Sequence, residues 1–160
     1  MRHVAFVGIG SNLDGPRAQV LAAFAALDAV PQTRVTGRSP LYCSAPLGGP
    51  PQPDYVNAVA RLATALDPEA LLDALRAIEA RQGRARSEEN APRTLDLDLL
   101  LYDATILDTP RLQLPHPRLH ERRFVLAPLL DLEPAAWIPG RGAAADLLAQ
   151  CATQRLERLP

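Results

Sequence analysis

The sequence predicts an α+β fold with a ferredoxin-like βαββαβ core, in which an antiparallel sheet carries helices packed mainly on one side and a C-terminal extension follows. The main observation is the order of the segments, which runs strand, helix, strand, strand, helix, strand. The chain has 160 residues without an internal repeat, low-complexity tract or linker, so we predict a single domain over residues 1–160. Because 48% of the residues are hydrophobic and 22% are charged, the chain can bury a substantial core.

Local patterns predict the first strand, the first helix and the second strand. Residues 4–9 form an apolar run typical of a buried strand, which leads into Gly8-Ile9-Gly10-Ser11-Asn12-Leu13. A Gly-x-Gly after a strand also occurs in dinucleotide-binding sites, but the third glycine is missing, which favours a tight turn. Pro16 suits the first position of a helix that ends before Pro31, and β-branched residues predict a strand over residues 33–43.

A proline- and glycine-rich loop, residues 44–53, separates this strand from the next one. Such a loop is either a spacer or part of a site, and its stiffness favours a shaped wall. Residues 55–62 then form a predicted strand on which Tyr55 and Asn57 point the same way. Such a pair can bind a planar, hydrogen-bonding ring, although a core tyrosine and a turn asparagine explain the two residues equally well.

The second helix has clear boundary signals. Asp67-Pro68-Glu69 combines an N-cap, a proline at the first helical position and an acid in the first turn, and Gly83 ends the helix. The polar, irregular residues 84–92 that follow are predicted to form a mobile lid.

The strand over residues 93–102 is the most informative stretch. Leucines alternate there with Asp96 and Asp98, so the second face carries two carboxylates roughly 7 Å apart at their Cα atoms. The simplest interpretation is a half-buried strand with a solvated acidic face. Three arginines favour another interpretation: Arg84, Arg86 and Arg93. Carboxylates that hold one or two Mg²⁺ ions, together with arginines that hold oxyanions, are what phosphoryl transfer from a nucleotide requires.

The last third of the chain carries fewer signals. A short strand is expected over residues 105–107. His116 lies between two prolines, which fix the direction of its ring, although a lone histidine is also common on a surface. We expect one helix to begin at Phe124 and another to cover residues 143–151.

Composition argues against several other classes of protein. A net charge of −1 disfavours a general nucleic-acid or membrane-surface binder, and no apolar run reaches the length of a membrane span. Cys43 and Cys151 are too few for a disulfide framework or a zinc site. We therefore expect a reduced, cytoplasmic protein, and the N-terminus has no apolar stretch that would predict a signal peptide.

Six short motifs follow one another along most of the chain. They are Gly10-Ser11-Asn12-Leu13, Pro46-Leu47-Gly48, Pro53-Asp54-Tyr55-Val56-Asn57, Glu79 with Gly83-Arg84-Ala85-Arg86, Pro92-Arg93-Thr94-Leu95-Asp96-Leu97-Asp98, and Pro115-His116-Pro117. In this order they resemble the 6-hydroxymethyl-7,8-dihydropterin pyrophosphokinase family of folate biosynthesis. The resemblance implies a pyrophosphokinase domain that transfers the β,γ-diphosphate of ATP to the hydroxymethyl group of a reduced pterin and releases AMP. It implies no obligate protein partner.

The resemblance also implies a role for individual residues. The implied catalytic residues are Arg84, Arg86, Arg93, Asp96 and Asp98, of which the two aspartates would hold two Mg²⁺ ions. The implied ATP-binding residues are Glu79, Arg84, Arg86, Arg93, Leu99, Arg111, His116 and Arg122. The implied pterin-binding residues are Ser44, Ala45, Pro46, Leu47, Tyr55, Asn57 and Phe124, with the pterin between the rings of Tyr55 and Phe124.

The chain departs from the family pattern at a few positions. Asn90 stands where some members have a tryptophan in the lid, Pro117 where some have an aromatic residue, and Gln113 where some have a small hydroxyl residue. Ser44-Ala45 replaces a Thr-Pro pair. These departures affect lid closure and contacts to the nucleotide base, and they leave the metal and arginine set intact.

Two other classes remain open at this point. A different two-metal enzyme, such as a nucleotidyl cyclase or phosphodiesterase, also needs paired acids, but it does not need the loop that precedes Tyr55 and Asn57. A nucleic-acid-binding ferredoxin-like module would need exposed aromatic residues and a basic face, which the low aromatic content and the net charge disfavour.

Overall fold

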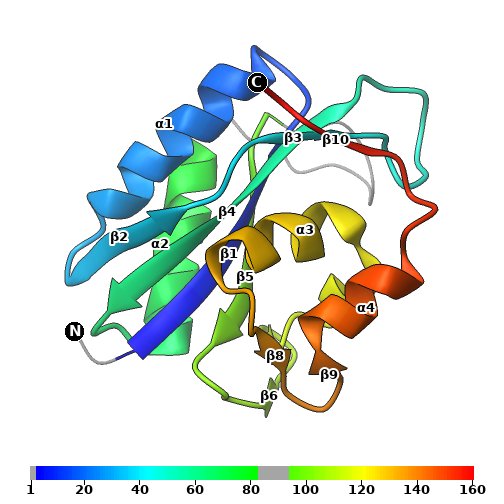
Figure 1. Ribbon diagram of the computed structural model, residues 1–160. Coiled ribbons are helices and arrows are strands. Elements are labelled where there is room, and N and C mark those ends of the chain that lie inside the picture. The colour runs from blue at the N-terminus through cyan, green and yellow to red at the C-terminus, as the bar shows by residue number, and fades with distance from the viewer. Residues whose placement is uncertain (1–2, 83–93) are drawn as a thin grey trace.

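The computed structural model describes residues 3–82 and 94–160, and it confirms the α+β fold (Figure 1). The main sheet consists of β1 (His3–Ser11), β2 (Thr33–Arg38), β3 (Tyr42–Ser44), β4 (Tyr55–Thr64), β5 (Asp96–Tyr102) and β10 (Leu156–Arg158). Its order is β10-β3-β4-β1-β5, β2 also pairs with β4, and all pairs are antiparallel. With β2 and β3 counted as one strand, this is the ferredoxin-like arrangement.

The single strand predicted over residues 33–43 is wrong, because the chain divides there into β2 and β3. β2 pairs with residues 60–64 of β4, and β3 pairs with residues 55–57. Between them, Ser39 bonds both backbone groups of Val59, with its N–H 3.0 Å from the Val59 oxygen and its Oγ 2.8 Å from the Val59 nitrogen. Pro40 follows and has no N–H to continue the ladder, so the strand is interrupted at this point.

Two helices, α1 (Pro16–Asp28) and α2 (Pro68–Arg81), cover one face of the sheet (Figure 1). Asp67 caps α2 as predicted, because its carboxylate accepts the Ala70 N–H at 2.8 Å. The predicted helix end at Gly83 lies outside the described residues. The core on this face includes Val7, Phe24, Leu62, Leu75 and Leu97.

The C-terminal part of the chain covers the opposite face. Phe6 and Val59 alternate along their strands with residues of the first core, and they pack against α3 (Arg123–Leu132) and α4 (Ala144–Gln150). The prediction of helices mainly on one side did not include this second layer. None of the described helices is long and apolar enough to cross a bilayer. The remaining elements are β6 (Leu107–Asp108), β7 (Gln113–Leu114), a 3₁₀ turn (Leu119–Glu121), β8 (Trp137–Ile138) and β9 (Gly142–Ala143).

A bulge in β5 fixes the position of His116. Val7 of β1 pairs with Leu99 and Phe6 with Leu101, so Leu100 is an extra residue in the ladder. The Leu100 carbonyl accepts the His116 N–H at 2.9 Å. The bulge therefore attaches the proline-flanked histidine to the strand that carries the two aspartates.

Candidate active site

A cavity of about 270 Å³ lies beside the carboxylate-bearing face of β5. The side chains around it come from strands that are distant in the sequence, from the loop after β3 and from the start of α3. They include Ser44, Pro46, Leu47, Tyr55, Asn57, Asp96, Asp98, His116, Arg118, Arg122 and Phe124. The fold thus brings the predicted acids, the histidine and the predicted ring-binding residues together.

Two glycines leave the carboxylates uncovered. In the ladder between β1 and β5, Gly10 pairs with Asp96 and Gly8 pairs with Asp98, and paired residues share a face of the sheet. Both glycines line the cavity. A Cβ atom at Gly10 would lie 3.4 Å from Nδ2 of Asn57, so it would take up space next to this cavity residue. Both glycines lie inside β1, so the prediction of a tight turn at this point is wrong.

The two carboxylates repel each other in a poorly solvated place. Burial, followed by the charge of Asp96, raises the pKa of Asp98 to about 7, although Arg122 and Arg76 act in the opposite direction. A pair of this kind binds a cation favourably, because the ion removes the repulsion. The alternation of leucine and aspartate produces the pair, since Leu97 and Leu99 point into the core from the same strand.

His116 stands beside this pair as a neutral ring. Its Nδ1 accepts the Arg118 N–H at 3.2 Å, so the proton belongs on Nε2, which lies 3.9 Å from Oδ1 of Asp98. Burial and the charge of Arg122 lower the pKa of His116 to about 4. The ring is therefore an uncharged donor at neutral pH.

Arg122 carries the clearest signal for an anion. Its Nε is buried and has no hydrogen-bond partner among the described residues, and its guanidinium carbon lies 5.6 Å from the centroid of the Phe124 ring. Buried donors are rarely left unsatisfied without a reason, and a phosphate oxygen in the cavity would satisfy this one. Arg118 lines the same cavity and was not among the predicted site residues. Its only sequence signal is its place directly after the His-Pro motif.

A second hollow, of about 260 Å³, adjoins the first. Asp98 and His116 line both hollows. The other side chains of the second one include Leu72, Arg76, Leu99, Arg111, Gln113 and Pro117. The candidate site therefore has two compartments that meet at the carboxylate and the histidine.

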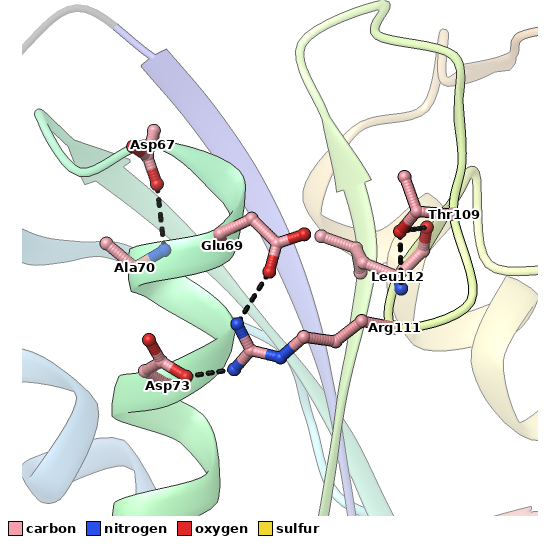
Figure 2. Close-up of polar contacts among 7 residues, drawn as sticks. All are labelled: Asp67, Glu69, Ala70, Asp73, Thr109, Arg111 and Leu112. Carbon is pink, nitrogen blue, oxygen red and sulfur yellow. Dashed lines mark hydrogen bonds and ion pairs between the residues drawn. The ribbon is translucent and has the colours of Figure 1, made fainter.

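Arg111 lines this second hollow, and Figure 2 shows its contacts with α2. Its guanidinium reaches α2, where one nitrogen lies 2.6 Å from a carboxylate oxygen of Glu69 and another pairs with Asp73. The side chain is about half exposed, so each pair contributes little stability and can exchange for another anion.

Comparison with known proteins identifies the family. The model of the family described as 7,8-dihydro-6-hydroxymethylpterin-pyrophosphokinase (HPPK) matches residues 6–134. The chain belongs to this family. A pyrophosphokinase of Pseudomonas aeruginosa, named 2-amino-4-hydroxy-6-hydroxymethyldihydropteridine pyrophosphokinase, is 50% identical over 155 residues, which cover 97% of this chain and 96% of the relative. The equally named protein of Haemophilus influenzae is 41% identical over 155 residues, covering 97% of each.

Solved structures agree at the level of the fold. A structure described as HPPK-DHPS in complex with substrates superposes with a TM-score of 0.72 at 13% identity, and a Plasmodium falciparum HPPK-DHPS with pteroate gives 0.74 at 12%. This chain covers 43% and 42% of those longer chains, and they cover 93% and 92% of this one.

The HPPK resemblance named seven pterin-binding residues, and all seven line the first cavity. The Ser44 hydroxyl donates to Oδ1 of Asn57 at 2.5 Å, which fixes the orientation of the amide. β10 supports this wall, because Leu156 pairs with Ser44 and Arg155 contacts Asp54 at 2.7 Å.

The remaining positions implied by the family resemblance are three arginines with the predicted lid, and Glu79. Arg84, Arg86 and Arg93, together with the predicted lid and Asn90, lie outside the described residues. Glu79 is described, and it lines neither hollow. Glu79 is 2% exposed, and its carboxylate accepts the backbone N–H of Leu97 in β5.

Proposed function

We infer that this chain is an ATP-dependent pyrophosphokinase of folate biosynthesis. It transfers the β,γ-diphosphate of ATP to the hydroxymethyl group of 6-hydroxymethyl-7,8-dihydropterin and releases AMP. Family membership supports this function. The observation that carries it in the structure is the pair of hollows that meet at Asp98 and His116, because a reaction between two substrates needs adjacent sites with a common border.

We assign the pterin to the first hollow. The ring would lie between Tyr55 and Phe124, where aromatic stacking adds to simple burial. Asn57, held by Ser44, would read the polar edge of the ring together with the backbone of residues 44–47. The hydroxymethyl group would then point toward the carboxylates.

We assign the nucleotide to the second hollow and its triphosphate to the border. Leu72, Leu99 and Arg111 line this hollow. Glu79, His116 and Arg122 are the other described residues that the family resemblance connects with ATP. Arg84, Arg86 and Arg93 are proposed to bind phosphate on the same grounds.

The residues at the border fit Mg²⁺. Asp96 and Asp98 offer two adjacent carboxylates, and within the described residues no group of three acidic, histidine or cysteine side chains forms a complete metal site. Mg²⁺ commonly takes one or two carboxylates and completes its shell with water and substrate phosphate. We propose that the two aspartates hold two ions, which would supply charge neutralisation on the phosphate oxygens when bound.

The chain's own donors would act on the transferred group. The buried Nε–H of Arg122 can donate to an oxygen on which charge develops, and such a bond is strong in a site shielded from water. His116 can donate from Nε2 without adding a charge. His116 is held in place by its bonds to Leu100 and Arg118, so little reorganisation of this donor is needed during transfer.

The proposal extends to organisation and compartment. We propose that residues 1–160 act as a single pyrophosphokinase domain, with small-molecule substrates and no obligate protein partner. The free thiols of Cys43 and Cys151 support a reducing, cytoplasmic location.

Product analysis tests the function directly. Purified protein is mixed with ATP, Mg²⁺ and 6-hydroxymethyl-7,8-dihydropterin, and the nucleotide product is identified by chromatography. AMP formed only in the presence of the pterin is the expected result. ADP would contradict attack on the β-phosphorus, and cyclic AMP would instead favour a nucleotidyl cyclase.

A further inference from the structure

Both the backbone N–H and the backbone carbonyl of Leu97 are hydrogen-bonded to side chains of α2. Its N–H donates to Oε2 of Glu79 at 2.8 Å, and its carbonyl accepts from Nη1 of Arg76 at 2.9 Å. The same Arg76 nitrogen donates to Oε1 of Glu79 at 2.7 Å. One guanidinium and one carboxylate therefore close a ring of three hydrogen bonds with a single strand residue. We call this arrangement the Leu97 clamp.

The clamp occupies an edge of the sheet. β5 is the last strand of its path, and among residues 3–82 and 94–160 it pairs with β1 only, so no strand described there covers its outer backbone groups. Water commonly satisfies such an edge, yet here the carboxylate of Glu79, a residue that is only 2% exposed, takes that place. A buried carboxylate costs free energy unless it is paired and hydrogen-bonded, and the contacts of Glu79 with Arg76 and Leu97 meet that condition.

The position of Leu97 gives the clamp a consequence for the site. Leu97 lies between Asp96 and Asp98, and successive side chains of a strand point to opposite faces. Fixing the peptide groups of Leu97 therefore fixes the directions in which both neighbouring carboxylates leave the strand. The bulge at Leu100 is the next fixed point along β5, through its bond to His116.

Two acids on an unsupported edge strand would relax by turning apart. Mg²⁺ demands near-ideal octahedral geometry, so a small rotation of the strand would weaken a shared ion. Groups behind the direct ligands commonly determine metal affinity in this way.

We propose that Arg76 and Glu79 are positioning residues: they hold the backbone of Leu97 so that Asp96 and Asp98 are oriented for a divalent cation bound together with the nucleotide. The role rests on the proposed function and deepens it. It gives Glu79 a task on the strand, and it adds Arg76 to the residues on which the reaction depends.

Amide hydrogen exchange in the metal-free, nucleotide-free protein tests the clamp itself. The variants are Glu79→Gln, which places an amide against Arg76, and Arg76→Met, which keeps the length of the side chain without its donors. Arg76 is 41% exposed, so its variant should fold even if the other does not. We expect the Leu97 amide to exchange roughly tenfold faster in Glu79→Gln, relative to the Val7 amide of the central strand, because a hydrogen-bonded network is broken. Arg76→Met should accelerate it less, since that variant acts on the N–H only through Glu79.

Leu71→Ala is the matched control. It removes buried apolar volume from the same helix without removing any hydrogen bond of the clamp, so it should destabilise the fold and leave the exchange ratio of Leu97 to Val7 unchanged. An unchanged ratio in both clamp variants would overturn the clamp.

Mn²⁺ affinity tests the positioning role. It is measured by electron paramagnetic resonance in the presence of a non-hydrolysable ATP analogue. Glu79→Gln should weaken it roughly 10- to 100-fold, although Glu79 lines neither hollow. Arg76 lines the hollow assigned to the nucleotide, so a loss confined to Arg76→Met would indicate a direct contact and would overturn the positioning role. Unchanged affinity despite faster exchange would overturn the proposal, as would an equal loss in Leu71→Ala. Wild-type AMP formation is scored separately: its absence rejects the proposed function, whereas normal AMP formation with unaltered Mn²⁺ affinity in the variants rejects only the positioning role.

Discussion

Replacing Asp98 with asparagine should make the metal-free protein more stable and the enzyme much slower. Burial and Asp96 move the pKa of Asp98 from 3.8 to about 7, and that shift already includes the opposing effect of the nearby arginines. At about 1.4 kcal/mol per pKa unit, the shift sets a ceiling of about 4 kcal/mol on the cost of the charge. Because 26% of the side chain stays exposed, solvent reduces this cost, and we expect the free energy of unfolding to rise by about 2 kcal/mol in Asp98→Asn.

The gain should depend on pH in a definite direction. The pKa of Asp98 is higher in the folded chain, so below about pH 4 both states are protonated and the charge costs nothing. As the pH rises toward 7, the unfolded chain loses its proton first, and the wild type loses stability relative to the variant. Above pH 7 the difference should stay constant.

Urea unfolding at pH 4.5, 6 and 8 in the presence of a chelator measures this difference. Asp108→Asn is the control, because it removes the same charge from an exposed residue of β6. Turnover with Mg²⁺ and ATP should fall on the order of 10²-fold in Asp98→Asn but not in Asp108→Asn. Equal stability of Asp98→Asn and the wild type at pH 8, or the same pH-dependent gain in Asp108→Asn, would refute the reasoning.

Three further predictions concern the ligands. Tyr55→Ala and Phe124→Ala should each weaken pterin binding by about 1–2 kcal/mol in calorimetry and leave binding of an ATP analogue unchanged; equal loss of both ligands would make these rings core residues. Asp73→Asn should tighten binding of the ATP analogue up to about fivefold, because Arg111 would lose a competing partner; weaker binding would mean that Asp73 orients Arg111 for the nucleotide. Arg84→Ala should lower kcat roughly 10²-fold with a smaller effect on ATP affinity, and a wild-type kcat would make this arginine a bystander.

The sequence alone predicted those features that depend on the pattern of residues within one helix or strand. Alternation in β5 predicted which side chains face the core and that Asp96 and Asp98 share a face. The same rule placed Tyr55 and Asn57 together, and the N-cap at Asp67 was visible from residue type alone. These features depend on neighbours within a few residues, so no knowledge of the tertiary structure was needed.

The failures concern pairings between distant segments. Gly8 and Gly10 have the local signature of a turn, but their function in the fold comes from Asp98 and Asp96, which pair with them across the ladder. The bulge at Leu100 is hidden in an apolar run, because an extra residue among leucines changes no hydropathy pattern. The hydrogen bond between the Leu97 N–H and Glu79 could not be predicted either, because only the docking of α2 against β5 brings these two residues together.

The wall of the first cavity, where we propose that the pterin binds, is completed by a late part of the sequence. β3 lies between β4 and β10. Both edges of β3 are therefore paired only after residues 156–158 have been added to the sheet. A chain emerges from the ribosome with its N-terminal part first, and the carboxylate-bearing β5 can join β1 well before β10 exists. During synthesis, the growing protein would therefore assemble the proposed metal- and nucleotide-binding side first and complete the proposed pterin site last. A chain cut before β10 should retain the first and lose the second.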